Sequence, residues 1–538
     1  MDLGVATHFS QGWDIGLAAE ITALGADHAR DSVRWEVGET GDGLYRFEGP
    51  RRDFPETLAA EDIDTRLVFL ARHPAYEGGA TVQSPAAIEA FGDYILAALA
   101  QFPDVATVEI GNEFNASNFV WGPLKAAGYE ARAEAHAEIV AGVRQRLDRA
   151  GAEVTLLGGA AHSIPVDYLA AAAEAGLLDT VDAVALHPYT SPPEHLGEHL
   201  DLLRARLGAP SLRIHATEFG REGGTPTEAA DHLVKMSAAL AAAGVESATW
   251  YALAEQKWFP NMELLGADGA TRPAGRAFAL MQHEVLSAGQ AWDLALDPLT
   301  QAIAFGDGAL VIWGSPRGVK LPGARWLDAR GEPVAAPVLH PARPLIALAD
   351  GSPLDLTDLT LEPSPVLADS FFEFALEEGR WQHSTLVDGK PRALEPLGGG
   401  KPGAPWRPYL GLDWLRPLQV TEWTVVPANF SPGSREKAHP ITETISIEET
   451  GGPIRVCGFV DVPERSADGI TLSIAGTAGS ILDRALAPGE RLQLDLPLAE
   501  AQRLAFTVDP GDTASGDRIR RRYVIVEGTT CPPVRDRL

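Results

Sequence analysis

Short apolar runs alternate with helical patterns through roughly the first 285 residues, and this alternation constrains the fold more than any other feature. Eight runs have the length and residue types of buried strands, with helical segments between them. They are Gly4–His8, His28–Trp35, Thr65–Leu70, Thr107–Ile110, Val154–Gly158, Val181–His187, Leu212–Thr217 and Ser247–Tyr251. Eight strand–helix units over this length predict an α/β fold, a single (β/α)8 TIM barrel.

Several intervening segments carry helix signals. Ser84-Pro85 and Thr225-Pro226 each place proline directly after a residue that favours the N-cap position. Leucines recur along Leu196–Leu207, and Gly208 follows as a C-terminal stop. The alternative to a barrel is an open, doubly wound sheet. That fold is typically accompanied by a glycine-rich phosphate loop after its first strand, and Ser10-Gln11-Gly12-Trp13 is not one.

The pattern changes after about residue 288, where helical periodicity gives way to short strands and Gly/Pro turns. Ala309–Gly314 and Ala324–Asp328 are predicted strands of a small β-domain, and Pro363-Ser364-Pro365 is a plausible linker. In the C-terminal third, apolar and polar residues alternate along several short segments, as in half-buried strands. We therefore predict a catalytic barrel over 1–287, a small β-sandwich side domain over 288–365 and a jelly-roll β-sandwich over 366–538.

Composition and charge narrow the class of partner. The 538 residues carry a formal charge of −30, which argues against nucleic acid and anionic lipid as partners. No apolar run reaches the length of a membrane span. The N-terminus shows no signal-peptide pattern, so the chain as written is predicted to be cytoplasmic, or periplasmic or secreted if a leader precedes residue 1. Cys457 and Cys531 could pair, but spacing alone does not decide this.

Two of the predicted strands run into a glutamate followed by a turn. Val108 and Ile110 lead into Gly-Asn-Glu at Glu113, and Leu212 and Ile214 lead into His-Ala-Thr-Glu at Glu218. In a parallel α/β barrel, the carboxyl ends of the strands carry the active site. Two glutamates that face one cleft there are the groups needed for glycosidic bond cleavage, one as acid and base and the other as nucleophile.

Asn112-Glu113 at the fourth strand and Glu218 at the seventh make the chain resemble glycoside hydrolase clan A. Within this clan, Ser32-Val33-Arg34-Trp35, Gly43-Leu44-Tyr45-Arg46-Phe47 and the small β-domain make it most similar to the family of β-xylosidases, α-L-iduronidases and exopolysaccharide hydrolases. The resemblance covers roughly residues 1–285. Many relatives begin with further strands that complete the side domain, whereas here the first barrel strand starts almost at Met1.

The resemblance implies roles for other residues at the same face. Arg34 would keep the nucleophile ionised, Asn112 would bond the sugar 2-OH, and Trp250 would form the floor under the sugar. The remaining substrate-binding candidates are His8, His73, His187, Tyr189 and Trp258. His73 could equally be a buried core residue, and a tryptophan such as Trp250 is also a normal residue of a barrel core.

The function that follows is retaining hydrolysis of a β-linked poly- or oligosaccharide, bacterial exopolysaccharide or xylan-like, without metal or cofactor. A transglycosylase uses the same residues. The other alternative is a catalytically silent carbohydrate-binding or polysaccharide-assembly protein on a glycosidase scaffold. The C-terminal sandwich could itself bind sugar. The sequence does not decide the sugar, the linkage, endo or exo action, or the oligomeric state.

Overall fold

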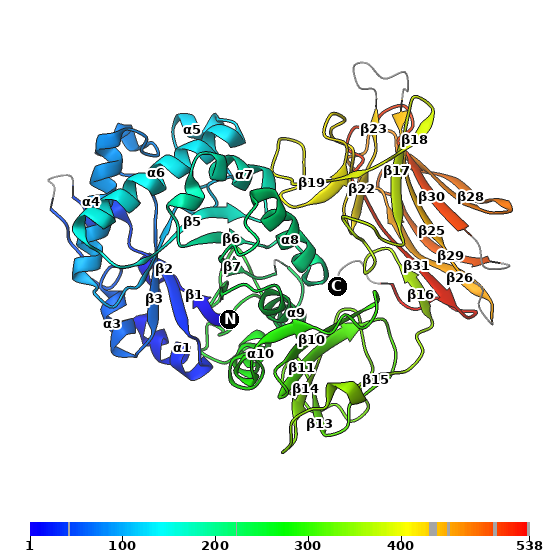
Figure 1. The fold of residues 1–538 in the computed structure, drawn as a ribbon, viewed down its shortest axis with the longest axis horizontal. Helices are drawn as coiled ribbons and strands as arrows, with labels where there is room; N and C mark the ends of the chain where they lie inside the picture. The colour runs from blue at the N-terminus through cyan, green and yellow to red at the C-terminus, as the bar shows by residue number, and fades with distance from the viewer. Residues whose placement is uncertain (41–43, 222, 430–437, 449–451, 499–502, 535–538) are drawn as a thin grey trace.

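The computed structural model describes residues 1–538 except 41–43, 222, 430–437, 449–451, 499–502 and 535–538, so Gly43 of the second sequence motif lies outside the described residues. Within them, eight parallel strands close into a barrel in chain order, which confirms the predicted (β/α)8 fold (Figure 1). The strands are β1 (Asp2–Ala6), β2 (His28–Ser32), β3 (Asp64–Phe69), β4 (Thr107–Ile110), β5 (Thr155–His162), β6 (Ala183–His187), β7 (Ile214–Phe219) and β8 (Ser247–Trp250).

Helices surround the barrel (Figure 1). They are α1 (Ala18–Leu24), α2 (Trp35–Gly38), α3 (Phe54–Ala60), α4 (Pro85–Gln101), α5 (Pro123–Ala126), α6 (Tyr129–Ala150), α7 (Val166–Glu174), α8 (Leu196–Leu207), α9 (Pro226–Ala242) and α10 (Pro273–Leu280). Thr225 and Glu228 form a capping box at the start of α9, and Gly208 ends α8 in the left-handed region. Among the described residues, no helix combines the length and apolarity needed to cross a membrane.

A five-stranded antiparallel sheet follows the barrel, in the order β13-β14-β11-β10-β9. Its strands are β9 (Ala291–Asp293), β10 (Thr300–Phe305), β11 (Ala309–Gly314), β13 (Ala324–Asp328) and β14 (Leu345–Ala349), and beside it β12 (Val319–Lys320) pairs with β15 (Thr360–Leu361). Trp313 Nε1 donates to Glu194 Oε1 at 2.8 Å, and Lys235 forms an ion pair with the same buried carboxylate. This shared contact fixes the sheet against the outer face of the barrel.

Two further antiparallel sheets form the C-terminal sandwich. One contains β16 (Val366–Asp369), β19 (Glu395–Leu397), β20 (Tyr409–Gly411), β21 (Gln419–Val420), β22 (Thr424–Val426), β26 (Ile454–Asp461), β29 (Arg491–Leu498) and β31 (Ile519–Glu527). The other contains β17 (Gln382–Val387), β18 (Lys390–Ala393), β25 (Ile441–Ser446), β27 (Ile470–Gly476), β28 (Gly479–Leu486) and β30 (Arg503–Asp509), and β23 (Ala428–Asn429) pairs with β24 (Ala438–His439). Phe506 and Tyr523 stack between the two sheets with ring centroids 4.2 Å apart.

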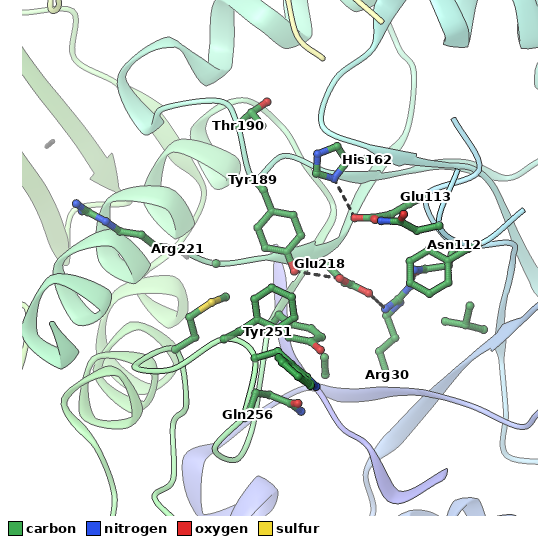
Figure 2. Close-up of a pocket in the computed structure, with 18 of the residues that line it drawn as sticks. Arg30, Asn112, Glu113, His162, Tyr189, Thr190, Glu218, Arg221, Tyr251 and Gln256 are labelled. Atoms are coloured by element: carbon green, nitrogen blue, oxygen red, sulfur yellow. Dashed lines mark hydrogen bonds and ion pairs between the residues drawn. The ribbon is translucent and has the colours of Figure 1, made fainter. Parts of the chain in front are cut away.

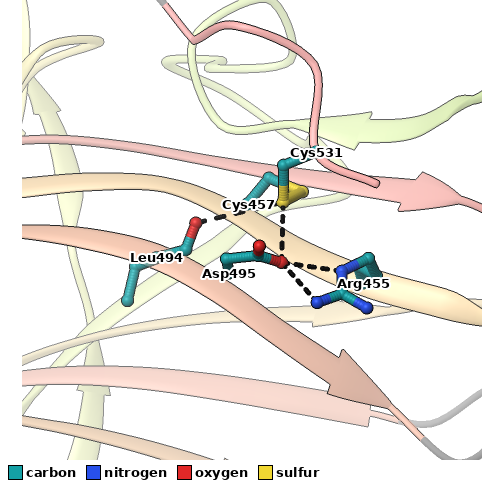
Figure 3. The surroundings of a disulfide bond; sticks show 5 residues. All are labelled: Arg455, Cys457, Leu494, Asp495 and Cys531. Carbon is teal, nitrogen blue, oxygen red and sulfur yellow. Dashed lines mark hydrogen bonds and ion pairs between the residues drawn. A yellow bond between two sulfur atoms is a disulfide. The ribbon is translucent and has the colours of Figure 1, made fainter. Parts of the chain in front are cut away.

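A disulfide joins Cys457 on β26 to Cys531, which follows β31 (Figure 3). The two Cα atoms lie 5.6 Å apart, and 74 positions separate the residues in the chain. Next to the disulfide bond, Asp495 Oδ1 forms an ion pair with Arg455 Nη2 at 2.6 Å. The cross-link therefore ties the segment after β31 to the neighbouring strand β26 and restricts the unfolded chain over a long loop.

Candidate active site

A cleft of about 1350 Å³ opens at the carboxyl ends of the barrel strands. Glu113, which follows β4, and Glu218, near the end of β7, both line it (Figure 2). One carboxylate oxygen from each lies within 4.8 Å of the other and of a ring nitrogen of His187. The fold thus brings together the two glutamates singled out from the sequence, although they are 105 positions apart (218 − 113).

Glu113 is held in an unusual backbone conformation. Gly111 and Glu113 both have positive φ, 85° and 43°, and glutamate rarely adopts such a value. This turn, directly after β4, directs the carboxylate into the cleft, where Oε1 hydrogen-bonds His162 Nδ1 at 2.9 Å and His187 Nδ1 at 3.3 Å. Burial alone would raise the pKa of Glu113, but the two histidines outweigh it and lower the pKa. Strain of this kind is typical of functional sites.

His162 was not singled out from the sequence, because the fifth strand was predicted to end at Gly158. In the structure, β5 continues to His162 through an irregularity between Gly158 and Ala161, where the pairing with β6 shifts register. Fully buried Asn115 then clamps the backbone of His162, since its amide accepts from His162 N at 2.8 Å and donates to His162 O at 3.1 Å. A bulge of this type redirects a side chain, here toward Glu113.

Glu218 is held by donors from two other strands. Arg30 Nη1 donates to its Oε1 at 2.6 Å, and the Tyr189 hydroxyl, just beyond β6, donates to its Oε2 at 3.0 Å (Figure 2). His187 Nδ1 lies 3.6 Å from the same Oε2. These contacts orient the carboxylate and stabilise its negative charge. Two of the candidates named from the sequence, His187 and Tyr189, thus lie beside Glu218.

The arginine in contact with Glu218 is Arg30, not Arg34 as predicted. The second strand ends at Ser32 rather than Trp35, so Arg34 lies at the start of α2. Arg34 is exposed on the rim of the cleft, and no ion pair joins it to Glu218. Alternation along a strand does not separate these two arginines, which are four positions apart; the point at which β2 ends decides which of them contacts Glu218, because Arg30 lies within the strand and Arg34 lies beyond it. The sequence did carry a signal for Arg30, because a charged residue in the middle of a predicted buried strand needs a partner inside the barrel.

Two other predicted residues do not reach the cleft. His73 is buried and hydrogen-bonds the Glu39 carbonyl at 3.0 Å, with its ring packed against Trp35. Trp250 is fully buried, and its Nε1 donates to the carbonyl of Met262 at 2.7 Å. The neighbouring Tyr251 lines the cleft in its place. Both are therefore core residues, the alternative that the sequence left open.

The remaining predicted residues lie at the cleft with different degrees of contact. Asn112 Oδ1 accepts from Arg30 Nη2 at 3.0 Å, which fixes its side chain beside Glu113. His8 lines the cleft and packs on Tyr251 with ring centroids 5.5 Å apart. Trp258 lines the outer part and is 75% exposed.

Glu109 is a third acidic residue at the site, and it was not singled out from the sequence. It points inward from the middle of β4, is buried, and accepts from Arg30 Nε at 2.7 Å. Burial raises its pKa, but Arg30 and His187 lower it to about 2, so the carboxylate is charged. The pKa of His187 is shifted in the opposite direction. Burial lowers the pKa of its imidazole, but Glu218, Glu109 and Glu113 raise it to about 9.

Glu113, His187 and Glu218 offer ligand atoms close enough together to hold a metal ion. The chemistry around them opposes a cation, since Arg30 already contacts Glu218 and the raised pKa of His187 favours a positive imidazolium. A histidine binds a metal ion only in its neutral form, so metal binding here would require His187 to lose that proton. The absence of a metal requirement stays a prediction.

Comparison with solved structures places this architecture among known folds. The chain is similar to a family 39 glycoside hydrolase from the gut symbiont Bacteroides cellulosilyticus WH2, with 18% identity, a TM-score of 0.54, and coverage of 65% of this chain and 80% of that one. The fold is the one found in that glycoside hydrolase. A family 39 β-xylosidase from Caulobacter crescentus matches with 15% identity, a TM-score of 0.44, and coverage of 65% and 95%. No protein-family model and no curated protein matches the chain.

Proposed function

We propose that this protein is a retaining glycoside hydrolase, with Glu218 as nucleophile and Glu113 as acid and base. The observation that supports this most is the proximity of the two carboxylates, whose oxygens approach within 4.8 Å. Retaining enzymes hold the two carboxyl groups about 5–5.5 Å apart, whereas inverting enzymes need about 6.5–9.5 Å to admit a water molecule. The (β/α)8 fold agrees with this assignment.

The surroundings of each glutamate suit its proposed role. Glu218 accepts hydrogen bonds from a cation and from a hydroxyl group, which hold its carboxylate in place for attack on the anomeric carbon. Glu113 must instead carry a proton when the leaving oxygen departs, then return to the anion and deprotonate water. Its hydrogen bonds to two histidines allow it to give and to regain that proton.

The proton for the first step is shared between Glu113 and His187. In the unliganded site, the lowered pKa of Glu113 and the raised pKa of His187 leave it on the imidazole. Transfer along the 3.3 Å contact from Nδ1 to Glu113 Oε1 keeps the net charge of the pair unchanged. When Glu218 becomes glycosylated, it loses the negative charge that stabilised the imidazolium. The affinity of His187 for the shared proton then falls.

For the substrate, we propose a β-linked poly- or oligosaccharide, with exopolysaccharide ahead of xylan. Support comes from the sequence resemblance and from aromatic residues around the cleft, among them Tyr251 and Trp258, which can stack on sugar rings. The experiment is to incubate the full chain with β-linked polymers, oligosaccharides and aryl glycosides, with and without EDTA, and to follow the first-formed anomer by ¹H NMR.

Retention of configuration, with rates unaffected by EDTA, is the expected result. Inversion would contradict the assigned roles. Sugar binding without turnover on any of these substrates would favour the non-catalytic alternative.

The shared proton predicts an alkaline limit to activity. We expect kcat/KM for a substrate with a poor leaving group to fall as the pH rises through about 9, because His187 and Glu113 then lose their common proton. A dinitrophenyl glycoside needs no protonation of its leaving group, so its kcat/KM should lack this alkaline limb. The same limb with both substrates would place the titration on another group.

The same shift also links pH to stability. A raised histidine pKa contributes stability that is present in full below the ordinary value of 6.5 and is lost as the pH rises through about 9. The free energy of unfolding, measured by denaturant titration, should therefore decline across this interval, and less so in a His187→Gln variant.

A further inference from the structure

The C-terminal sandwich forms one wall of the cleft. The residues of the sandwich that line it include Phe371, Arg407, Trp423, Arg518 and Arg520. The wall is attached to the barrel by the 398–407 segment. The carbonyls of Gly398 and Gly399 accept from Val166 N at 3.1 Å and Asp167 N at 3.2 Å at the start of α7, and Arg407 donates to the Thr190 carbonyl.

This wall reaches the proposed acid and base. Trp406 packs edge-on against His162, with ring centroids 6.1 Å apart, and His162 hydrogen-bonds Glu113 at 2.9 Å. The flanking Pro405 and Arg407 line the cleft. A sugar residue beside the one being cleaved would therefore lie against the sandwich as well as the barrel.

The charge of the wall is positive, in contrast to the rest of the chain. The net charge of the chain is −30, yet Arg407, Arg518 and Arg520 all line this side. Arg407 forms an ion pair with buried Glu422, and Arg520 lies 3.9 Å from Asp461. These two guanidinium groups are at least partly neutralised by the protein itself.

Arg518 differs from these two because no carboxylate in the described part of the chain forms an ion pair with it. It is half-buried, and burial together with neighbouring Arg465 and Arg407 lowers the pKa of its guanidinium group. The adjacent Asp517 is buried and accepts a hydrogen bond from Ser466 Oγ at 2.7 Å, and it forms no ion pair with Arg518. Holding a cation among cations costs free energy, which a bound anion would recover.

We propose that the sandwich wall is a subsite for an anionic sugar residue, in which Arg518 binds a carboxylate or sulfate group and Trp423 provides an aromatic surface. A guanidinium group offers a planar pair of donors that matches either anion in a bidentate manner, and aromatic rings pack on the apolar faces of sugars. The inference rests on the proposed function and narrows its substrate class to acidic glycans.

The test measures binding rather than turnover, by calorimetric titration of the full-length Glu218→Ala variant at low salt. The probes are a β-1,4-linked glucuronic acid tetrasaccharide, the glucose tetrasaccharide that is its carboxyl-reduced counterpart, and a sulfated glucose tetrasaccharide. We expect at least one acidic probe to bind roughly tenfold more tightly than the neutral one, the effect of one charge-assisted hydrogen-bonding pair. The two acidic probes distinguish a carboxylate site from a sulfate site.

Substitutions in the same background assign this preference to a residue. Arg518→Gln should remove most of the ratio of acidic to neutral affinity, and Arg518→Lys should remove part of it by losing the bidentate geometry. Arg503→Gln is the matched control, because Arg503 is exposed on β30, does not line the cleft and changes the net charge equally. Thermal unfolding followed by circular dichroism would check that each variant is folded.

Equal affinity for acidic and neutral probes, no measurable binding of either acidic probe, or an equal loss in the Arg503→Gln variant would overturn the proposal. Failure of the proposed function has a different signature. If the unmodified protein hydrolyses none of the glycans tested, but acidic probes still bind more tightly through Arg518, the subsite stands and the catalytic assignment is wrong. Hydrolysis without the preference gives the reverse conclusion.

Discussion

Replacing Glu218 with alanine is expected to lower kcat by at least about 10⁴-fold, because it removes the carboxylate proposed to attack the anomeric carbon. Azide should restore turnover of an aryl glycoside, since a small anion can occupy the space left by the carboxylate. It then attacks directly, and the product from a β-linked substrate should be the α-glycosyl azide. Initial rates with and without azide, together with ¹H NMR of the product, measure both effects.

A matched control for this experiment is Glu89→Ala. Glu89 is exposed on the outer face of α4, pairs only loosely with Arg149 at 3.4 Å, and does not line the cleft. The Glu89→Ala substitution removes the same charge, but from the surface, and should leave kcat unchanged. Substantial residual activity of Glu218→Ala without azide, or a rescued product with retained configuration, would show that another residue is the nucleophile.

Replacing Glu113 with alanine should lower kcat/KM by about 10²–10⁴-fold on substrates with poor leaving groups, the usual contribution of general acid catalysis. A dinitrophenyl glycoside should still form the glycosyl-enzyme, because its leaving group departs without a proton. The intermediate should then accumulate, since no base activates water. Burst kinetics and mass spectrometry of the intact protein would detect it.

Azide should also rescue the Glu113→Ala variant, but with the opposite stereochemistry. Here the anion attacks the glycosyl-enzyme on the face vacated by Glu113, so a β-linked substrate should yield the β-glycosyl azide. The two variants thus differ in the configuration of a single product. An α-glycosyl azide from Glu113→Ala, or no difference between leaving groups, would exchange or refute the two roles.

The proposed subsite for an anionic sugar would connect the two ends of the chain in function. Trp406 contacts His162 beside the proposed acid and base, and Arg518 lies on the same side of the cleft, so the sandwich is placed to act on the same substrate as the barrel. The sequence suggested only that this sandwich could bind sugar. Its position beside the barrel narrows that suggestion to a single surface.

The sequence by itself determined the barrel and the two glutamates. Both depend on local patterns, because burial of strands and helices imposes hydrophobic periods that can be read over a few residues. Ala309–Gly314 and Ala324–Asp328 were likewise predicted with the bounds that the structure has for β11 and β13. Glu113 and Glu218 were found because each follows such a run at the edge where parallel strands end.

Only the tertiary structure decided which neighbours these glutamates have. Arg30 rather than Arg34 contacts Glu218 because β2 ends at Ser32, which leaves Arg30 inside the strand and Arg34 beyond it. His162 reaches Glu113 through an irregularity in β5 that breaks the period on which the prediction relied. Arg518 faces the cleft through contacts between segments more than 200 residues apart, such as Arg407 with Thr190. Such long-range packing depends on the whole fold, and no local pattern encodes it.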